Sequence, residues 1–250
     1  MKQLQGKIAI VTGGAAGFGE GIVRTYVAEG AKVMIADLDS SKGEALAKEL
    51  GTNAKFVRCD VSKGPDVIAL VQACVDTFGT PEVVVNNAGT THANRPLMEV
   101  DEATFDLMFA VNVKSIFHMT RAVVPLMRQN KKGVMLNVGS TAGIRPRPGL
   151  TWYNGSKGAV NLLSKSLAVE LGPDGIRVNA ICPVMGETGL LEKFMGVPDT
   201  PENRARFIAT IPLGRLCRPA DVAAAALYLA SDAANFISGV EFPVDGARTV

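Results

Sequence analysis

The sequence predicts an α/β fold in which helices cover both faces of a doubly wound parallel sheet, built as a single domain. Short apolar runs of strand length alternate along the whole chain with longer segments of helical periodicity, starting with a run at residues 8–11. No internal repeat, low-complexity tract or linker divides the 250 residues. Folds of alternating strands and helices often form one unit at this length.

The elements are expected in the following order. Strands are predicted at residues 8–11, 32–36, 55–59, 82–85, 134–138, 176–181 and 240–244. Helices are predicted at residues 22–30, 40–50, 65–78, 101–129, 156–171 and 219–229, and Pro125 is expected to kink the longest of them near its end. Residues 182–184 are expected to form a turn. Residues 186–213 combine glycines, prolines and short amphipathic pieces, which predicts a substrate-binding lid.

Composition limits the classes of function. With 47% hydrophobic and 20% charged residues, the chain resembles soluble globular proteins, and no segment approaches the roughly 18 apolar residues of a membrane span. The net charge of +2 is scattered without basic runs, which gives no sign of a nucleic-acid partner. The N-terminal residues lack a signal peptide's apolar core. We therefore predict a cytoplasmic protein that binds neither nucleic acid nor membrane.

Four cysteines show no metal-ligand spacing and lie in apolar or strand-like surroundings. They are Cys59, Cys74, Cys182 and Cys217. Such residues are expected to be buried free thiols of a reducing compartment. We predict no metal site.

A glycine-rich turn, Thr-Gly-Gly-Ala-Ala-Gly-Phe-Gly at residues 12–19, joins the first strand to the first helix. Glycines let the backbone approach a ligand closely, and the free amides at a helix start attract an anion. The turn therefore favours a phosphate site, with a turn needed only for packing as the alternative.

Asp37 follows the second strand, eighteen residues beyond Gly19. An acid at this position can accept hydrogen bonds from an adenosine ribose and would repel the extra phosphate of NADP. We therefore predict NAD as the cofactor in preference to NADP. The alternative is that Asp37 caps the next helix, although Asp39 and Ser40 could do that as well.

Further polar residues follow the carboxyl ends of predicted strands, where parallel sheets bind ligands. Asp60 follows the third strand, Asn-Asn-Ala-Gly at 86–89 follows the fourth, and Ser140 follows the fifth. For the asparagines, local turn chemistry is the alternative. Asn112 lies among apolar residues inside the longest helix, where it is either a packed, hydrogen-bonded amide or a functional one.

Tyr153 and Lys157 are separated by one helical turn. A phenol and an ammonium at this spacing lie on one face of a helix and can act on the same bound molecule. The pair is therefore a candidate for proton transfer. The alternative is an aromatic residue and a solvated charge on a surface helix.

The glycine turn with Thr12, the Asn-Asn-Ala-Gly tetrapeptide, Asn112, Ser140 and the Tyr153-x-x-x-Lys157 pair occur together in this order. This set resembles the short-chain dehydrogenase/reductase family, and the likeness runs from Gly6 to the Asp-Gly near the C-terminus. The resemblance implies a Rossmann-type sheet and a catalytic tetrad of Asn112, Ser140, Tyr153 and Lys157. It also implies a homotetramer whose main interface is formed by the helices around Asn112 and after Ser156.

The resemblance also implies which residues hold the cofactor. Those expected in contact with it are Gly13, Gly17, Phe18, Gly19, Asp37, Asp60, Val61, Asn87, Ala88, Gly89, Tyr153, Lys157, Pro183 and Thr188. Among them, Asp60 and Val61 would contact the adenine and Thr188 the nicotinamide carboxamide. Three positions depart from the family pattern. Val184 stands where Gly is frequent, Gly186 where Val or Ile is common, and Ala247 where a second Gly is commoner, so substrate fit and subunit contacts are expected to differ.

The implied function is an NAD(H)-dependent oxidoreductase that interconverts a secondary alcohol and a ketone, with Tyr153 as general acid or base. A free tyrosine has a pKa of about 10, and the positive charges of Lys157 and of the oxidised nicotinamide should both lower it. Ser140 would bind the substrate oxygen, and Asn112 would position a water that relays the proton. The alternatives are a catalytically inactive dinucleotide-binding regulator and an NADP-preferring carbonyl reductase.

The substrate is predicted only as a small alcohol or ketone, with a sugar or polyol and a 3-oxoacyl thioester both suited to such an enzyme. Arg145 and Arg147 favour an anionic or polyhydroxylated substrate, or else belong to a solvated loop. His92 is expected to be structural, because Tyr153 and Lys157 already supply an acid and a base. The residues expected to border the pocket are His92, Asn94, Arg95, Gly143, Arg145, Arg147, Trp152 and residues 187–211.

Overall fold

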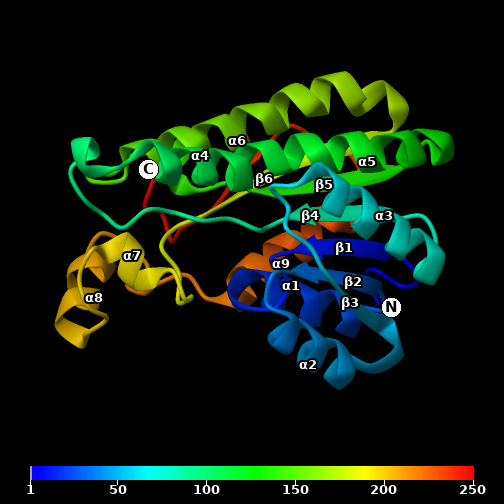
Figure 1. The fold of residues 1–250 in the computed structure, drawn as a ribbon, viewed down its shortest axis with the longest axis horizontal. Coiled ribbons are helices and arrows are strands. Elements are labelled where there is room, and N and C mark those ends of the chain that lie inside the picture. The colour runs from blue at the N-terminus through cyan, green and yellow to red at the C-terminus, as the bar shows by residue number, and fades with distance from the viewer. Residues whose placement is uncertain (1) are drawn as a thin grey trace.

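The computed structural model describes residues 2–250, and its centre is one parallel sheet of seven strands in the order β3-β2-β1-β4-β5-β6-β7 (Figure 1). The strands are β1 Ile8–Thr12, β2 Lys32–Asp37, β3 Ala54–Arg58, β4 Val83–Asn86, β5 Gly133–Val138, β6 Ile176–Pro183 and β7 Glu241–Val244. The strand order reverses direction between β1 and β4. In such sheets ligands bind beyond the carboxyl ends of the strands at this reversal.

Helices cover both faces of the sheet (Figure 1). One layer consists of α1 Gly17–Ala28, α2 Ser40–Leu50 and α9 Pro219–Ala230. The opposite layer consists of α3 Gly64–Phe78, α4 Glu102–Phe109, α5 Ser115–Asn130 and α6 Thr151–Leu171. Short one-turn helices occur at Gly51–Asn53, Leu97–Glu99, Thr141–Gly143, Gly172–Asp174 and Asp232–Ala234. The predicted doubly wound fold is confirmed.

The strands are apolar throughout because both of their faces are buried. In β1, Ala9 and Val11 pack into the core beneath α1 and α9, whereas Ile10 packs into the core beneath α3 and α5. In β2, Ile35 and Met34 divide between the two cores in the same way. Side chains alternate between faces along a strand, so each apolar run contributes to both cores.

The predicted helix at 101–129 is interrupted in the structure. A π-helical turn, Ala110–Lys114, separates α4 from α5, and Asn112 is buried within it. The helix continues past Pro125 to Asn130, so the break comes well before the proline. Such π turns are frequent at functional sites.

Two other boundaries differ from the prediction. Cys182 and Pro183 were expected in a turn, but they lie in β6, where they pair with Pro243 and Val244 of β7. Pairing with this edge strand extends β6 toward the site. Helix α6 begins at Thr151, so Tyr153 lies in its first turn.

The irregular segment at 186–213 contains two short helices, α7 Leu191–Met195 and α8 Pro201–Ile208. Their apolar side chains form a small cluster of their own with Leu191, Met195, Ile211 and Leu216. In Figure 1 these helices lie apart from the two helical layers, beyond the carboxyl ends of the strands. The segment is therefore placed next to the predicted site.

All four cysteines are buried and unpaired, as predicted. Within residues 2–250, no helix has both the length and the apolar character that crossing a membrane requires.

Candidate active site

A cleft of about 620 Å3 lies at the carboxyl ends of the central strands. Nearly all of the predicted site residues line it. They are Gly13, Gly17, Phe18, Asp37, Asp60, Val61, Asn87, Ala88, Gly89, Ser140, Tyr153, Lys157, Pro183 and Thr188. Gly19 and Asn112 lie behind the lining. The volume is in the usual range of about 300–1,000 Å3 for pockets that bind small molecules and cofactors.

The glycine turn is closely packed and leaves backbone donors free. Gly13 and Gly17 have φ values of 60° and 57°, which side chains disfavour, and a Cβ on Gly19 would overlap the carbonyl of Gly13. No side chain caps the start of α1. The amides of its first turn are therefore available to an anion, as a dinucleotide's phosphates would require.

Thr12 and Asn87 hold the glycine turn against the end of β4. The Thr12 hydroxyl accepts hydrogen bonds from the backbone amides of Asn87 and Ala88, both at 3.1 Å. The Asn87 side-chain amide donates to the carbonyls of Thr12 and Gly13, both at 2.9 Å. The Asn87 side chain therefore orients the glycine turn, and Asn87 also lines the cleft. The sequence indicated Thr12 only as part of a motif and did not reveal this bracing role.

Asp37 and Asp60 lie at the end of the cleft next to β2 and β3. The Asp37 carboxylate accepts from the amides of Ala15 at 3.0 Å and Asp39 at 3.1 Å. Asp39 caps α2 by accepting from the Lys42 amide, so the alternative role of Asp37 as the cap is wrong. The Asp60 carboxylate accepts from the Ser62 hydroxyl at 2.6 Å, which lowers the pKa of Asp60.

Tyr153 and Lys157 are both buried on one face of α6. The Lys157 amine lies 6.0 Å from the centre of the Tyr153 ring and donates to the Val138 carbonyl at 2.7 Å, at the end of β5. Ser140 follows the same strand, and its hydroxyl accepts from the Ala142 amide at 3.0 Å. The Ser140 hydroxyl lies close enough to the Tyr153 hydroxyl to favour the ionised phenol. The structure therefore brings the phenol, the hydroxyl and the amine together.

Burial controls the acidity of this cluster. Burial raises the pKa of Tyr153 to about 12, against the opposing effects of the nearby Ser140 hydroxyl and the positive charge of Arg147. Burial also lowers the pKa of Lys157 to about 8. Among the protein's own groups, desolvation of the phenolate outweighs the nearby positive charge, so the lowering predicted from Lys157 is not found. The lowering predicted from the nicotinamide stays a prediction.

Asn112 is a fully hydrogen-bonded amide in the π turn. Its side-chain oxygen accepts from the Thr90 amide at 2.8 Å, and its nitrogen donates to the Thr90 carbonyl at 2.9 Å and to the Ser156 hydroxyl at 3.0 Å. Ser156 in turn donates to the Tyr153 carbonyl at 2.8 Å. Asn112 therefore ties the segment after β4 to the first turn of α6.

The end of the cleft near Tyr153 is largely apolar. The Phe194 ring of α7 meets the Tyr153 ring edge to face at 5.1 Å between centroids. The lid and its neighbours contribute Thr188, Gly189, Leu190, Phe194, Phe207, Thr210 and Ile211 to the lining. Part of the segment predicted to border the pocket therefore lines the cleft, and its role as a substrate-binding lid stays a prediction.

Only part of the predicted border lines the cleft. Arg145 and Arg147 do, whereas His92, Asn94, Arg95, Gly143 and Trp152 do not. The buried ring of His92 places Nδ1 2.9 Å from the Ala93 carbonyl, consistent with the structural role predicted for it. Trp152 donates to the Leu97 carbonyl at 3.2 Å and packs against Phe105, away from the site.

The sequence did not reveal the lining contributed by Leu107, Val111, Leu150, Met185, Arg248 and Thr249. The last two residues reach the cleft because the Asp245 carboxylate accepts from the Thr249 amide and hydroxyl, at 2.9 and 2.6 Å. Ala247 has φ 70°, a conformation that favours glycine. Ala247, which stands where the family commonly has a second glycine, therefore holds a strained backbone conformation. It lies in the turn that leads Arg248 and Thr249 to the cleft.

The glycine at 186 also has a structural reason. A Cβ at this position would overlap the ring of Phe18, which lines the cleft. With the Phe18 ring in this position, glycine at 186 avoids a clash that a larger residue would relieve only by displacing the ring. This accounts for the second departure from the family pattern.

Comparisons with known proteins agree with this geometry. A family model described as "Enoyl-(Acyl carrier protein) reductase" matches residues 13–248. The chain is 48% identical to 4-formylbenzenesulfonate dehydrogenase of Comamonas testosteroni, over 99% of both proteins. It is 36% identical to 2-(S)-hydroxypropyl-CoM dehydrogenase 3 of Xanthobacter autotrophicus, over 99% of this chain and 98% of the relative.

Among solved structures, the chain resembles a 3-ketoacyl-(acyl-carrier-protein) reductase from Brucella melitensis complexed with NADH. The TM-score is 0.94 at 43% sequence identity, and the match covers 99% of this chain and 100% of the other. The chain therefore belongs to the short-chain dehydrogenase/reductase family of oxidoreductases.

Proposed function

We propose that the protein interconverts a secondary alcohol and a ketone by hydride transfer with NAD(H). The observation that carries this proposal is the convergence of Tyr153, Ser140 and Lys157 in one wall of a cleft that continues to the glycine turn and Asp37. A single elongated ligand in this cleft would bring its reactive end beside the tyrosine. The relatives named as dehydrogenases and reductases support the reaction class.

The residues of the cleft suit a nicotinamide dinucleotide, which supplies the acceptor or donor of the hydride. The free amides of the glycine turn would bind the pyrophosphate, and Asp37 would bind the adenosine ribose. Asp60 and Val61 would border the adenine, Asn87 to Gly89 the middle of the cleft, and Pro183 and Thr188 the nicotinamide. Among residues 2–250, the lining at the Asp37 end holds no basic side chain, which favours NAD over NADP.

Tyr153 would exchange the proton. Because its pKa is about 12, the phenol keeps its proton at neutral pH and can donate it to a ketone oxygen as the carbonyl carbon receives the hydride. In the opposite direction the alcohol loses a hydride from carbon and its O–H proton goes to the Tyr153 oxygen, which must then be ionised. The positive charges of Lys157 and Arg147 favour that ionised form.

Ser140 and Asn112 would support this exchange. The Ser140 hydroxyl, which lies near that of Tyr153, would hold the substrate oxygen beside the phenol. A Cβ on Gly89 would lie 3.4 Å from the Asn112 side-chain oxygen and 3.5 Å from the Lys157 amine, so a small space separates these two groups. A water there could relay protons to Lys157, whose pKa of about 8 suits exchange near neutrality.

The lining near Tyr153 also bears on the substrate. Its apolar and aromatic side chains, including Leu150, Phe194 and Phe207, favour an apolar or aromatic body over a sugar or polyol. The 48% identical relative is named for an aromatic aldehyde bearing a sulfonate. An aromatic secondary alcohol or ketone is therefore the preferred substrate class, and a 3-oxoacyl thioester is the second candidate because of the similar ketoacyl reductase.

We also propose a cytoplasmic homotetramer. Four buried, unpaired cysteines suit a reducing compartment. Apolar side chains exposed on the outer faces of α5 and α6 suit contact with other copies of the chain.

The proposal is tested with Tyr153→Phe, which removes the hydroxyl and keeps the ring. We expect loss of turnover by at least about 100-fold with NADH binding nearly unchanged. The measurements are NAD(H)- and NADP(H)-linked absorbance across aromatic alcohols, sugars, polyols and oxoacyl thioesters, and fluorescence titration with NADH. Tyr228→Phe, at a partly exposed tyrosine of α9 outside the cleft, is the matched control. Full activity in Tyr153→Phe would refute the assignment, and NADH binding without turnover by the wild type would favour an inactive dinucleotide-binding regulator.

A further inference from the structure

The charged side chains that line the cleft are separated by sign. The acidic ones, Asp37 and Asp60, lie at the end next to β2 and β3. Besides Lys157, the basic ones are Arg145, Arg147 and Arg248, which line the part of the cleft near Tyr153. Within residues 2–250, none of these three guanidinium groups forms a salt bridge.

Arg147 is held in place by the lid. Its guanidinium donates to the Phe194 carbonyl at 2.8 Å and lies 5.1 Å from the centre of the Phe207 ring. Its own carbonyl accepts from the Asn154 side chain at 2.8 Å. A guanidinium has five N–H donors, so most of them remain for a ligand. These contacts orient the group and exclude the alternative of a solvated loop for Arg147.

Arg248 adds positive charge near Arg147, and Arg145 is hydrogen-bonded to the backbone of Arg248. Arg145 donates to the Arg248 carbonyl at 3.0 Å, which joins the loop after β5 to the C-terminal tail. Burial lowers the pKa of Arg147, and the charge of Arg248 lowers it further, which indicates that the two groups repel each other. Two positive charges held close together with no carboxylate between them raise the electrostatic free energy of the folded protein. An anion bound between them would relieve the repulsion.

We propose that Arg147, with Arg145 and Arg248, forms a subsite for a carboxylate or sulfonate group of the substrate. This inference rests on the proposed function, in which the reacting carbon lies at Tyr153. Apolar side chains line the same cleft, with Phe194 against Tyr153 and Phe207 against Arg147, so the substrate is an alcohol or carbonyl compound with an apolar body and an anionic group. The cofactor's phosphates are expected elsewhere, at the glycine turn and toward Asp37.

The test compares matched substrates with wild type and variants. The substrates are 4-(1-hydroxyethyl)benzoate, 4-(1-hydroxyethyl)benzenesulfonate and the neutral 4-(1-hydroxyethyl)benzamide, each oxidised with NAD. Wild type should prefer one or both anionic substrates over the amide by about 10- to 100-fold in kcat/KM, and the stronger of the two identifies the preferred anion. Arg147→Gln should lose this preference mainly through KM, and Arg147→Lys should retain part of it.

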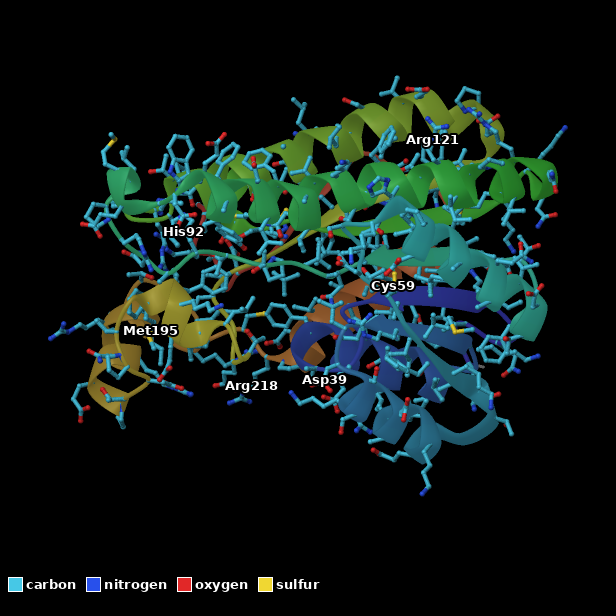
Figure 2. The ribbon with its side chains drawn as sticks, in the orientation of Figure 1. Asp39, Cys59, His92, Arg121, Met195 and Arg218 are labelled. Atoms are coloured by element: carbon cyan, nitrogen blue, oxygen red, sulfur yellow. The ribbon has the colours of Figure 1, made fainter. Side chains whose placement is uncertain are left out.

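Arg121→Gln is the control, because Arg121 is exposed on α5 and does not line the cleft. Figure 2 shows Arg121 among the outer helices, remote from Met195 of the lid. This variant should keep the wild-type preference. A loss of preference equal to that of Arg147→Gln would show that general surface charge is responsible and would overturn the subsite.

A binding measurement separates failure of the subsite from failure of the proposed function. Benzenesulfonate, benzoate and benzamide are titrated calorimetrically into the protein saturated with NADH. Tighter binding of an anion to wild type than to Arg147→Gln supports the subsite even where no alcohol is turned over, which would refute only the proposed function. Equal binding of anions and amide, unchanged in Arg147→Gln, overturns the subsite even where Tyr153-dependent turnover is observed.

Discussion

Asp37 has two roles at once, and each has its own consequence. Its carboxylate lines the end of the cleft proposed for the adenosine, and it also accepts from the Ala15 amide within the glycine turn. A substitution will therefore loosen the turn for either dinucleotide and remove the repulsion of the NADP phosphate. The ratio of the two cofactors, rather than the activity with one, reports the selectivity.

We expect Asp37→Ala to shift the ratio of kcat/KM for NAD over NADP toward NADP by about 10- to 100-fold, the usual value of hydrogen bonds to a charged group. Initial rates with both cofactors at fixed substrate measure the shift. Asp39→Ala is the control, because Asp39 caps α2 and does not line the cleft. It should destabilise the fold slightly by removing the helix cap and leave the ratio unchanged. An unchanged ratio in Asp37→Ala would favour an NADP-preferring reductase.

Lys157 links the site to the stability of the fold. Its pKa is about 8 in the folded chain, against 10.5 for an exposed lysine. Between these pH values the unfolded chain binds more protons than the folded one, so the free energy of unfolding rises with pH. The slope approaches about 1.4 kcal/mol per pH unit. The pKa of Tyr153 is about 12 instead of 10.0, so above pH 10 this residue makes the free energy of unfolding fall with pH. Below pH 10 it has little effect.

We therefore expect wild type to gain up to about 2 kcal/mol relative to Lys157→Met between pH 8 and pH 10. Urea unfolding at several pH values measures this difference. Lys165→Met, which removes an exposed amine from the same helix, should follow wild type across the range. A constant difference between wild type and Lys157→Met would mean that the buried amine is not destabilised by its charge.

At the scale of elements, local patterns predicted most of the fold. Apolar runs such as residues 32–36 predict their strands because a strand buried on both faces has few polar residues. The break in the helix at 101–129 escaped prediction, since the apolar residues continue through the π turn Ala110–Lys114. Its cause is the hydrogen bonding of Asn112 to Thr90, a partner 22 residues away that periodicity cannot reveal.

The site shows the same division between local and distant causes. Tyr153 and Lys157 were recognisable because helical spacing alone places them on one face. The bracing of the glycine turn by Asn87 depends on two strands lying side by side, and the entry of Arg248 into the cleft depends on the turn at Asp245. Such lining residues become visible only when the chain is folded.

At the scale of the whole molecule, the sheet order places every candidate group at one edge. The reversal between β1 and β4 leaves the glycine turn and the segment after β4 facing each other, and β5 and β6 add Ser140 and Pro183 to the same edge. The short helices α7 and α8 lie beyond this edge (Figure 1). The opposite, outer faces of α5 and α6 remain free for contacts with other copies.

Those outer faces carry apolar side chains that water disfavours. Phe117 of α5 is 53% exposed, and Leu162 and Val169 of α6 are 64% and 82% exposed. If they form the expected interface, light scattering after size exclusion will give about 105 kDa, four times the 26.3 kDa of one chain. The double variant Leu162→Asp and Val169→Asp should then give a smaller assembly, because buried carboxylates without partners are costly. Ile68→Asp, at an equally exposed residue of α3, is the control and should keep the wild-type mass.

A monomeric wild type would exclude the tetramer. An unchanged mass in the double variant would place the tetramer interface away from α6.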